Sequence, residues 1–84
     1  MTNNEMLKKR IMYRSSHRGS KEMDLLLASF VKSYIHKLNS KELIELDSLL
    51  HLSDEIIYNW YFKNILNDKI LDTKLSTMLK KHKL

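Results

Sequence analysis

The chain has 84 residues, with 15 Lys or Arg against 10 Asp or Glu and a net charge of +5. A chain of this length supports one hydrophobic core, so we expect one domain over residues 1–84. It contains no cysteine, no proline and a single glycine, Gly19. This composition excludes disulfide frameworks and thiolate metal cages, and it argues against β-sandwiches, Rossmann units and phosphate-binding loops, which depend on turn-forming residues.

The first half of the chain predicts two helices, because its apolar residues recur at steps of three and four. The first runs from about Glu5 to His17 and uses Leu7, Ile11 and Tyr13 as its apolar positions. The second carries the longest stripe, which consists of Met23, Leu26, Leu27, Phe30, Val31, Tyr34, Ile35 and Leu38. Ser20 is its predicted N-cap.

Three shorter helices are predicted in the second half. Ser40 and Ser53 are the predicted N-caps of the first two. The inward residues are Leu43, Leu46 and Leu50 in one helix, and Ile56, Ile57, Trp60, Tyr61 and either Ile65 or Leu66 in the next. After a break at residues 67–68, a last helix uses Leu71, Leu75, Met78 and Leu79, and residues 80–84 are expected to fray as a basic tail. Because the connections are short, we predict an all-α fold, a small antiparallel five-helix bundle.

Charge is distributed unevenly along the chain. Residues 1–21 carry six basic residues and one acidic residue, residues 22–68 carry eight acidic residues and four lysines, and residues 69–84 carry five lysines and one acidic residue. Both ends therefore suit an acidic partner. The longest apolar run, residues 25–28, is too short to span a bilayer, so no membrane insertion is expected. The chain begins without a secretory signal, and we expect a bacterial cytoplasmic location, or the mitochondrial matrix in a eukaryote.

The sequence offers little chemistry for catalysis or metal binding. The four histidines, His17, His36, His51 and His82, have no second ligand at helical spacing, so no metal site is expected. Glu22 and Asp24 are two apart on a helix and point in different directions, which argues against a catalytic carboxylate pair and against an enzyme. Tyr58 and Phe62 are four apart on the face opposite the core stripe, and we expect them to form a small exposed apolar patch for a protein partner.

The most distinctive segment surrounds the single glycine. Gly19 lies where the first helix must end, and we expect it to adopt the left-handed conformation that glycine tolerates. In one interpretation Arg18 and Glu22 are solvated charges that each stabilise a helix terminus. In the other, the break projects both of them from the corner between two helices as a polar recognition point, flanked by Arg14 and His17. The residues alone leave both interpretations open.

Two motifs resemble those of a known family. The stretch Arg18-Gly19-Ser20-Lys21-Glu22 resembles the Arg-Gly-x-x-Glu signature of the succinate dehydrogenase assembly factors, also called the SdhE or flavinator family. A second block is similar to that family's at the same distance, and it comprises Leu49, Leu50, Asp54, Tyr58 and Trp60. His17 stands where many members have a second arginine, and Ile56 replaces the usual second acid. The resemblance covers about residues 7–62.

The resemblance implies a non-enzymatic assembly factor. Such a factor binds the flavoprotein subunit of succinate dehydrogenase, and sometimes that of fumarate reductase, and promotes covalent attachment of FAD to a histidine of that subunit. The reacting groups belong to the partner and to FAD, so no cofactor is expected to be bound stably by this chain. The implied partner contacts are Arg18, Glu22 and a close approach at Gly19, with Arg14, His17 and Asp24 as flanking residues. We expect a monomer when free.

Two other functions remain open at this point. A small basic nucleic-acid binder would suit the net charge of +5. Its weakness is that the bases lie at the two ends of the chain, and no helix shows a basic recognition face, so no nucleic-acid partner is expected. A regulatory, toxin-neutralising protein could use the same corner.

Overall fold

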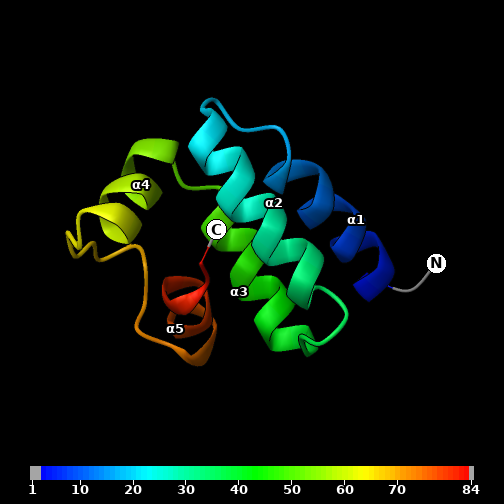
Figure 1. Cartoon of the computed structure of the whole chain (residues 1–84). Helices are drawn as coiled ribbons and strands as arrows, with labels where there is room; N and C mark the ends of the chain where they lie inside the picture. Colours follow the sequence, from blue (N-terminus) through cyan, green and yellow to red (C-terminus); the bar gives the residue numbers. More distant parts are fainter. Residues whose placement is uncertain (1–2, 84) are drawn as a thin grey trace.

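The structure, a computed structural model, describes residues 3–83, which form five α-helices and no strand (Figure 1). The helices are α1 (Asn3–Ser15), α2 (Lys21–Tyr34), α3 (Ser40–Leu50), α4 (Asp54–Phe62) and α5 (Lys74–Lys81). The predicted all-α fold with five helices is therefore confirmed. No helix in this part of the chain has the length and apolar character needed to cross a bilayer.

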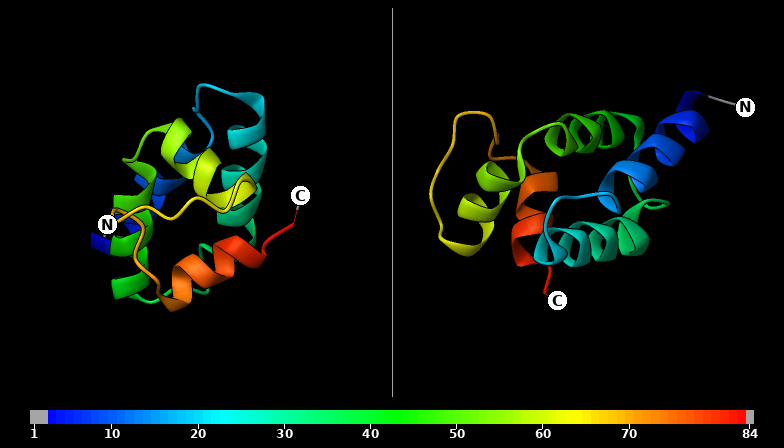
Figure 2. Two further views of the ribbon diagram at one scale, coloured as in Figure 1. Left: turned by 90° about the vertical axis from the view of Figure 1, so that its left-hand side faces the viewer. Right: turned by 90° about the horizontal axis from the view of Figure 1, so that it is seen from above.

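The helices surround one core. Seen from above, α2 and α3 lie in two rows with opposite chain directions, while α1 lies near one end of these rows and α5 lies between them near the other (Figure 2, right). Helix α1 packs against both α2 and α3, and α5 packs against α3. Helix α4 lies on the outside, next to the long segment that leads to α5 (Figures 1 and 2).

The core is almost entirely aliphatic. Its fully buried members from the five helices are Ile11, Met23, Leu26, Leu27, Phe30, Leu43, Leu46, Ile57, Leu75 and Leu79. Burial of each large apolar side chain contributes about 1.5–3 kcal/mol. Most of the stripe predicted for α2 is buried, including Ile35 and Leu38 after the helix ends at Tyr34.

Side-chain caps define where most of the helices begin. Ser20 and Ser53 cap α2 and α4, each accepting a hydrogen bond at 3.3 Å from the backbone N–H three residues later, as predicted. The cap of α3 was predicted one residue too late. Asn39 caps this helix through a capping box with Glu42, in which the two reciprocal bonds measure 2.8 and 3.0 Å.

The predicted boundaries of α1, α4 and α5 need correction. Helix α1 ends at Ser15, and Tyr13 is 64 % exposed and lies outside the core. Helix α4 ends at Phe62, because Asn64 has a left-handed φ of 56° that redirects the chain. Consequently Ile65 and Leu66 are exposed, and Ile70 is buried in their place. Helix α5 begins at Lys74, so Leu71 precedes it, and Leu71 is exposed.

Residues after Leu79 make defined contacts. Lys80 and Lys81 belong to α5, and the Lys80 ammonium donates hydrogen bonds to the backbone carbonyls of Trp60 and Tyr61. The His82 ring lies edge-on to Phe30, and its Nε2 is 2.7 Å from the Ser29 hydroxyl. Leu84, the last residue of the expected frayed tail, lies outside the described residues.

Candidate functional site: the corner between α1 and α2

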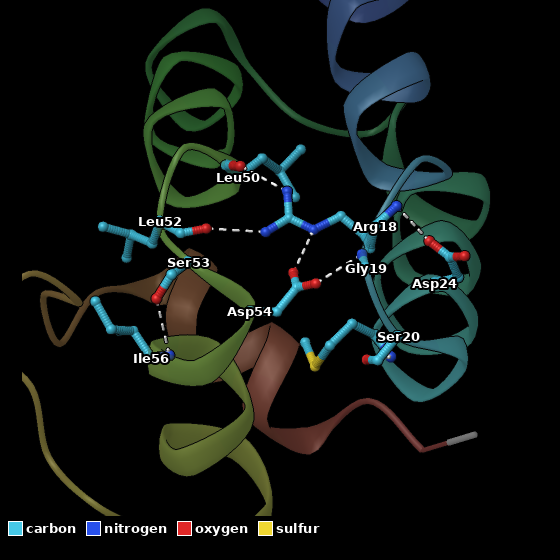
Figure 3. Close-up of polar contacts among 10 residues, drawn as sticks. Arg18, Gly19, Ser20, Asp24, Leu50, Leu52, Ser53, Asp54 and Ile56 are labelled. Atoms are coloured by element: carbon cyan, nitrogen blue, oxygen red, sulfur yellow. Dashed lines mark hydrogen bonds and ion pairs between the residues drawn. The ribbon is translucent and has the colours of Figure 1, made fainter.

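The Arg18 side chain connects two loops that are distant in sequence. It is only 10 % exposed, and it extends from the loop between α1 and α2 toward the loop between α3 and α4 (Figure 3). Its Nη1 and Nη2 donate to the carbonyls of Leu50 and Leu52 at 2.7 and 2.9 Å. These carbonyls lie at or just beyond the end of α3, where the negative end of the helix dipole favours a cation.

Asp54 is the acceptor for both residues of the Arg-Gly pair. Its Oδ1 accepts from Arg18 Nε at 2.7 Å, and its Oδ2 accepts from the backbone N–H of Gly19 at 2.8 Å (Figure 3). As the first residue of α4, Asp54 also places its negative charge at a helix N-terminus, where it is stabilised. The carboxylate therefore joins the corner to the start of α4 through charge-assisted hydrogen bonds.

Gly19 is needed here for its small size. The expectation of a left-handed glycine was wrong, because Gly19 does not have a positive φ. A Cβ at this position would lie 3.1 Å from Asp54 Oδ2, closer than most real contacts of that kind. Because that oxygen is held by the Gly19 N–H itself, it has little freedom to retreat. The glycine thus permits the close approach of a backbone and a carboxylate.

The predicted pair of Arg18 and Glu22 does not point outward together. Arg18 is directed into the corner, whereas Glu22 is exposed and has no hydrogen-bond or ion-pair partner within the described chain. The reason is that a guanidinium can donate to one carboxylate and two carbonyls at once, which favours the inward position. Asp24 joins the corner from α2, where its Oδ1 accepts from the Arg18 backbone N–H at 2.6 Å.

The flanking residues belong to a polar row between α1 and α3. Arg14 donates to His51 Nε2, and His51 Nδ1 lies 2.7 Å from the Asp47 carbonyl. In this arrangement the Nε2 accepts from Arg14, and the Nδ1–H donates to the Asp47 carbonyl. One turn earlier, Arg10 forms a bidentate pair with the Asp47 carboxylate at 2.9 and 3.2 Å. Arg14 is therefore directed toward α3.

His17 lies on the outer side of the corner. Its ring stacks on Tyr13 with the ring centroids 3.9 Å apart, and its Nδ1 is 2.7 Å from the Tyr13 carbonyl. Both rings are exposed. The exposed surface of the corner is thus formed by the Glu22 carboxylate, the backbone of Gly19 and the stacked ring of His17.

Sequence reasoning missed the central role of Asp54. It was identified only as part of the second motif block, although it accepts from both Arg18 and Gly19. It lies 36 residues from Arg18, and helical periodicity carries no information about contacts over that distance. Asp47 and His51, which engage Arg10 and Arg14, were missed for the same reason.

The corner is suited to recognition of a polar surface. Within residues 3–83, no group of three or more His, Asp or Glu side chains is placed to hold a metal ion. Partial burial lowers the pKa of Lys80, which lies far along the chain from the corner. The backbone turn at Gly19 is held in place by hydrogen bonds, and the Glu22 carboxylate beside it has no partner in the described chain. Together they offer hydrogen-bond and ion-pair contacts to another macromolecule.

Comparison with known proteins agrees with the resemblance of the two motifs. Residues 9–83 match the family described as "Flavinator of succinate dehydrogenase". The chain is similar to "Succinate dehydrogenase assembly factor 2, mitochondrial" of Saccharomyces cerevisiae, with 44% identity over 84 aligned residues that cover 93% of this chain and 52% of the relative. The protein of the same name in Dictyostelium discoideum is 36% identical over 78 residues, covering 93% of this chain and 55% of the relative.

The chain thus spans about half the length of the curated relatives that it matches. The matched region contains the whole corner, with Arg14, Arg18, Gly19, Glu22 and Asp54, and all of α2 to α5. The chain belongs to the flavinator of succinate dehydrogenase family.

Proposed function

We propose that this chain is an assembly factor that binds the flavoprotein subunit of succinate dehydrogenase and promotes covalent attachment of FAD to a histidine of that subunit. Membership of the flavinator family supports the proposal, and the curated relatives carry the name of succinate dehydrogenase assembly factor. Those relatives are named as mitochondrial, so in a eukaryote we propose the mitochondrial matrix as the location.

The observation that carries the proposal is the rigid corner with one unpaired carboxylate. Arg18, Gly19 and Asp54 fix the backbone through four hydrogen bonds of 2.7–2.9 Å, and Glu22 stands beside them without a partner in the described chain. A surface that is already ordered loses little conformational entropy when it binds. Glu22 and the Gly19 backbone therefore form the proposed contact, while His17, Arg14 and Asp24 flank it and Arg18 acts as a positioning residue.

The chain would act through binding alone. FAD and the acceptor histidine remain in the flavoprotein subunit, and this chain contributes contacts that favour the arrangement of the subunit in which they react. A binding preference of about 2.7 kcal/mol for that arrangement raises its population about a hundredfold relative to the others. The corner needs no catalytic group of its own for this effect.

Nucleic-acid binding is less well supported by the geometry. Three of the basic side chains near the corner are engaged within the chain, Arg10 by Asp47, Arg14 by His51 and Arg18 by Asp54. Phosphate contacts would require these cations to be free.

The proposal is tested by flavinylation in vitro. The purified chain is incubated with the apo-flavoprotein subunit and FAD, the mixture is denatured, and covalent flavin is measured by its fluorescence in a gel. We expect more covalent flavin than in the reaction without the chain. Equal fluorescence in the two reactions would contradict the proposal.

The contact at Glu22 is tested by Glu22→Gln. We expect flavinylation at limiting concentrations of the chain to slow by about tenfold, since one partner of a desolvated charge pair is lost. Glu55→Gln is the matched control, because Glu55 is also an exposed glutamate at the second position of a helix with a serine N-cap. If both variants behave alike and keep the wild-type unfolding midpoint, Glu22 is not a contact.

A further inference from the structure

A groove lies at the end of α4 that is remote from the corner. Asp54, at the start of α4, belongs to the corner, whereas Trp60, near the end of α4, lines the groove. The groove has a volume of about 480 Å³, within the range of sites that enclose organic ligands or several side chains. Its walls come from α4, the following segment and α5, and comprise Trp60, Asn64, Leu66, Ile70, Leu71, Asp72, Ser76, Thr77, Lys80 and Lys81.

The rim of the groove exposes an unusual amount of apolar surface. Leu66 is 90 % exposed and Leu71 is 66 % exposed, and both line the groove. Ile65 and Phe62, at 52 and 40 %, continue the apolar surface along the same segment. Four of the nine exposed large hydrophobic residues in the described part of the chain therefore lie within residues 62–71. Such a concentration is typical of a site that another molecule covers.

The groove carries positive charge at its side. The Lys80 ammonium lies 4.7 Å from the centroid of the Trp60 ring and donates to the carbonyls at the end of α4. Lys81 also lines the groove, and it has no hydrogen-bond or ion-pair partner in the described chain. Among the residues that line the groove, two lysines, Lys80 and Lys81, outnumber the single acidic residue, Asp72. An occupant with carboxylates is therefore favoured, and a symmetric second copy of the chain, which would bring the same lysines together, is disfavoured.

We propose that this groove binds a segment of the flavoprotein subunit that presents a large apolar side chain next to carboxylates. The apolar side chain enters between Leu66 and Leu71 and contacts Trp60, and the carboxylates pair with Lys81 at the side. This inference rests on the proposed function, and it adds a second contact surface to the corner. The two surfaces lie at opposite ends of α4, so the partner is held at two points.

The apolar contact is tested by Leu66→Ser, with Ile44→Ser as the matched control. Ile44 is 60 % exposed on α3 and lies outside the groove, so neither substitution removes core packing. Binding to the apo-flavoprotein subunit is measured by calorimetry. We expect Leu66→Ser to raise the Kd about tenfold or more, as loss of one buried leucine contact predicts, and Ile44→Ser to leave it unchanged. Equal Kd values for the two variants would overturn the inference.

The charge contact is tested by Lys81→Glu against Lys83→Glu. Both lysines are exposed near the end of the chain, and only Lys81 lines the groove. We expect a larger rise in Kd for Lys81→Glu, together with a weaker dependence of the Kd on sodium chloride. A photoreactive amino acid in place of Leu66 should in addition cross-link to an acidic and apolar segment of the subunit. Cross-linking to a basic segment would overturn the inference.

These outcomes separate the inference from the proposed function. If the wild-type chain promotes flavinylation and the groove variants bind normally, the groove inference is wrong and the assembly function stands. If the wild-type chain neither binds the subunit nor promotes flavinylation, the assembly function is wrong, and the groove inference that rests on it is wrong as well.

Discussion

At the scale of single residues, the Arg18 guanidinium has a structural role. It donates to the carbonyls of Leu50 and Leu52 and to the Asp54 carboxylate, with distances of 2.7–2.9 Å. A buried cation is tolerated when its N–H groups find acceptors. Here each of the three guanidinium nitrogens donates one hydrogen bond. The shape of the corner depends on this one side chain and on the carboxylate that faces it.

We predict that Asp54→Ala lowers the free energy of unfolding by about 2–4 kcal/mol, because it leaves a largely buried cation without its carboxylate. The Gly19 N–H loses its acceptor in the same substitution. Urea unfolding followed by circular dichroism measures the change. Glu55→Ala, one residue later and exposed, is expected to change stability by less than about 0.5 kcal/mol. A loss below about 1 kcal/mol for Asp54→Ala would contradict the inference that Asp54 holds Arg18 and Gly19 in the corner.

The sequence located the corner and misjudged its orientation. Arg18, Gly19 and Glu22 could be selected because a single glycine interrupts two helical patterns, and Asp24 was added only as a flanking residue implied by the family resemblance. The direction of the Arg18 side chain depends on Asp54, 36 residues later, and on main-chain carbonyls that carry no sequence signal. The contact with Asp54 also decides why position 19 holds a glycine. The small size of the residue is needed there, and a left-handed φ is not.

At the scale of helices, the capping residues decide where elements begin. Asn39 and Ser40 are both good N-cap residues, and the helix starts after Asn39 because Glu42, three residues later, completes a capping box. That spacing is visible in the sequence and could have identified the cap. The end of α4 was less predictable, since Asn64 adopts a left-handed φ of 56° within an otherwise helical apolar pattern.

We predict that Asn39→Ala lowers the free energy of unfolding by about 1 kcal/mol, because the hydrogen bond from the Glu42 backbone N–H to the Asn39 side chain is lost. Ser40→Ala is the matched control. The Ser40 hydroxyl accepts one exposed hydrogen bond from Asn4, so its removal should have an effect of less than about 0.5 kcal/mol. Thermal unfolding of the two variants provides the comparison. A larger loss for Ser40→Ala would show that the cap is misassigned.

At the scale of the whole molecule, the last residues hold separate parts of the fold together. His82 contacts Phe30 and Ser29 of α2, and its carbonyl accepts a hydrogen bond from Tyr61 of α4. Lys80 links α5 to the end of α4. These contacts join α2, α4 and α5, although periodicity alone predicted a solvated tail.

We predict that His82→Ala lowers the free energy of unfolding by about 1–2 kcal/mol, because a hydrogen bond to Ser29 and two edge-on aromatic contacts are lost. Lys83→Ala, an exposed neighbour, should leave the unfolding midpoint unchanged. Chemical denaturation monitored by tryptophan fluorescence measures both. Equal midpoints for the two variants would mean that the His82 side chain contributes nothing to stability.

The inward direction of Arg18 affects how mutagenesis of the Arg-Gly motif is interpreted. A variant at Arg18 or Gly19 that is inactive has two possible causes, either a missing contact with the partner or a corner that has come apart from α4. An activity assay alone does not distinguish them. Only substitutions that retain the melting temperature of the parent chain, as expected for exposed Glu22, can map the docking surface.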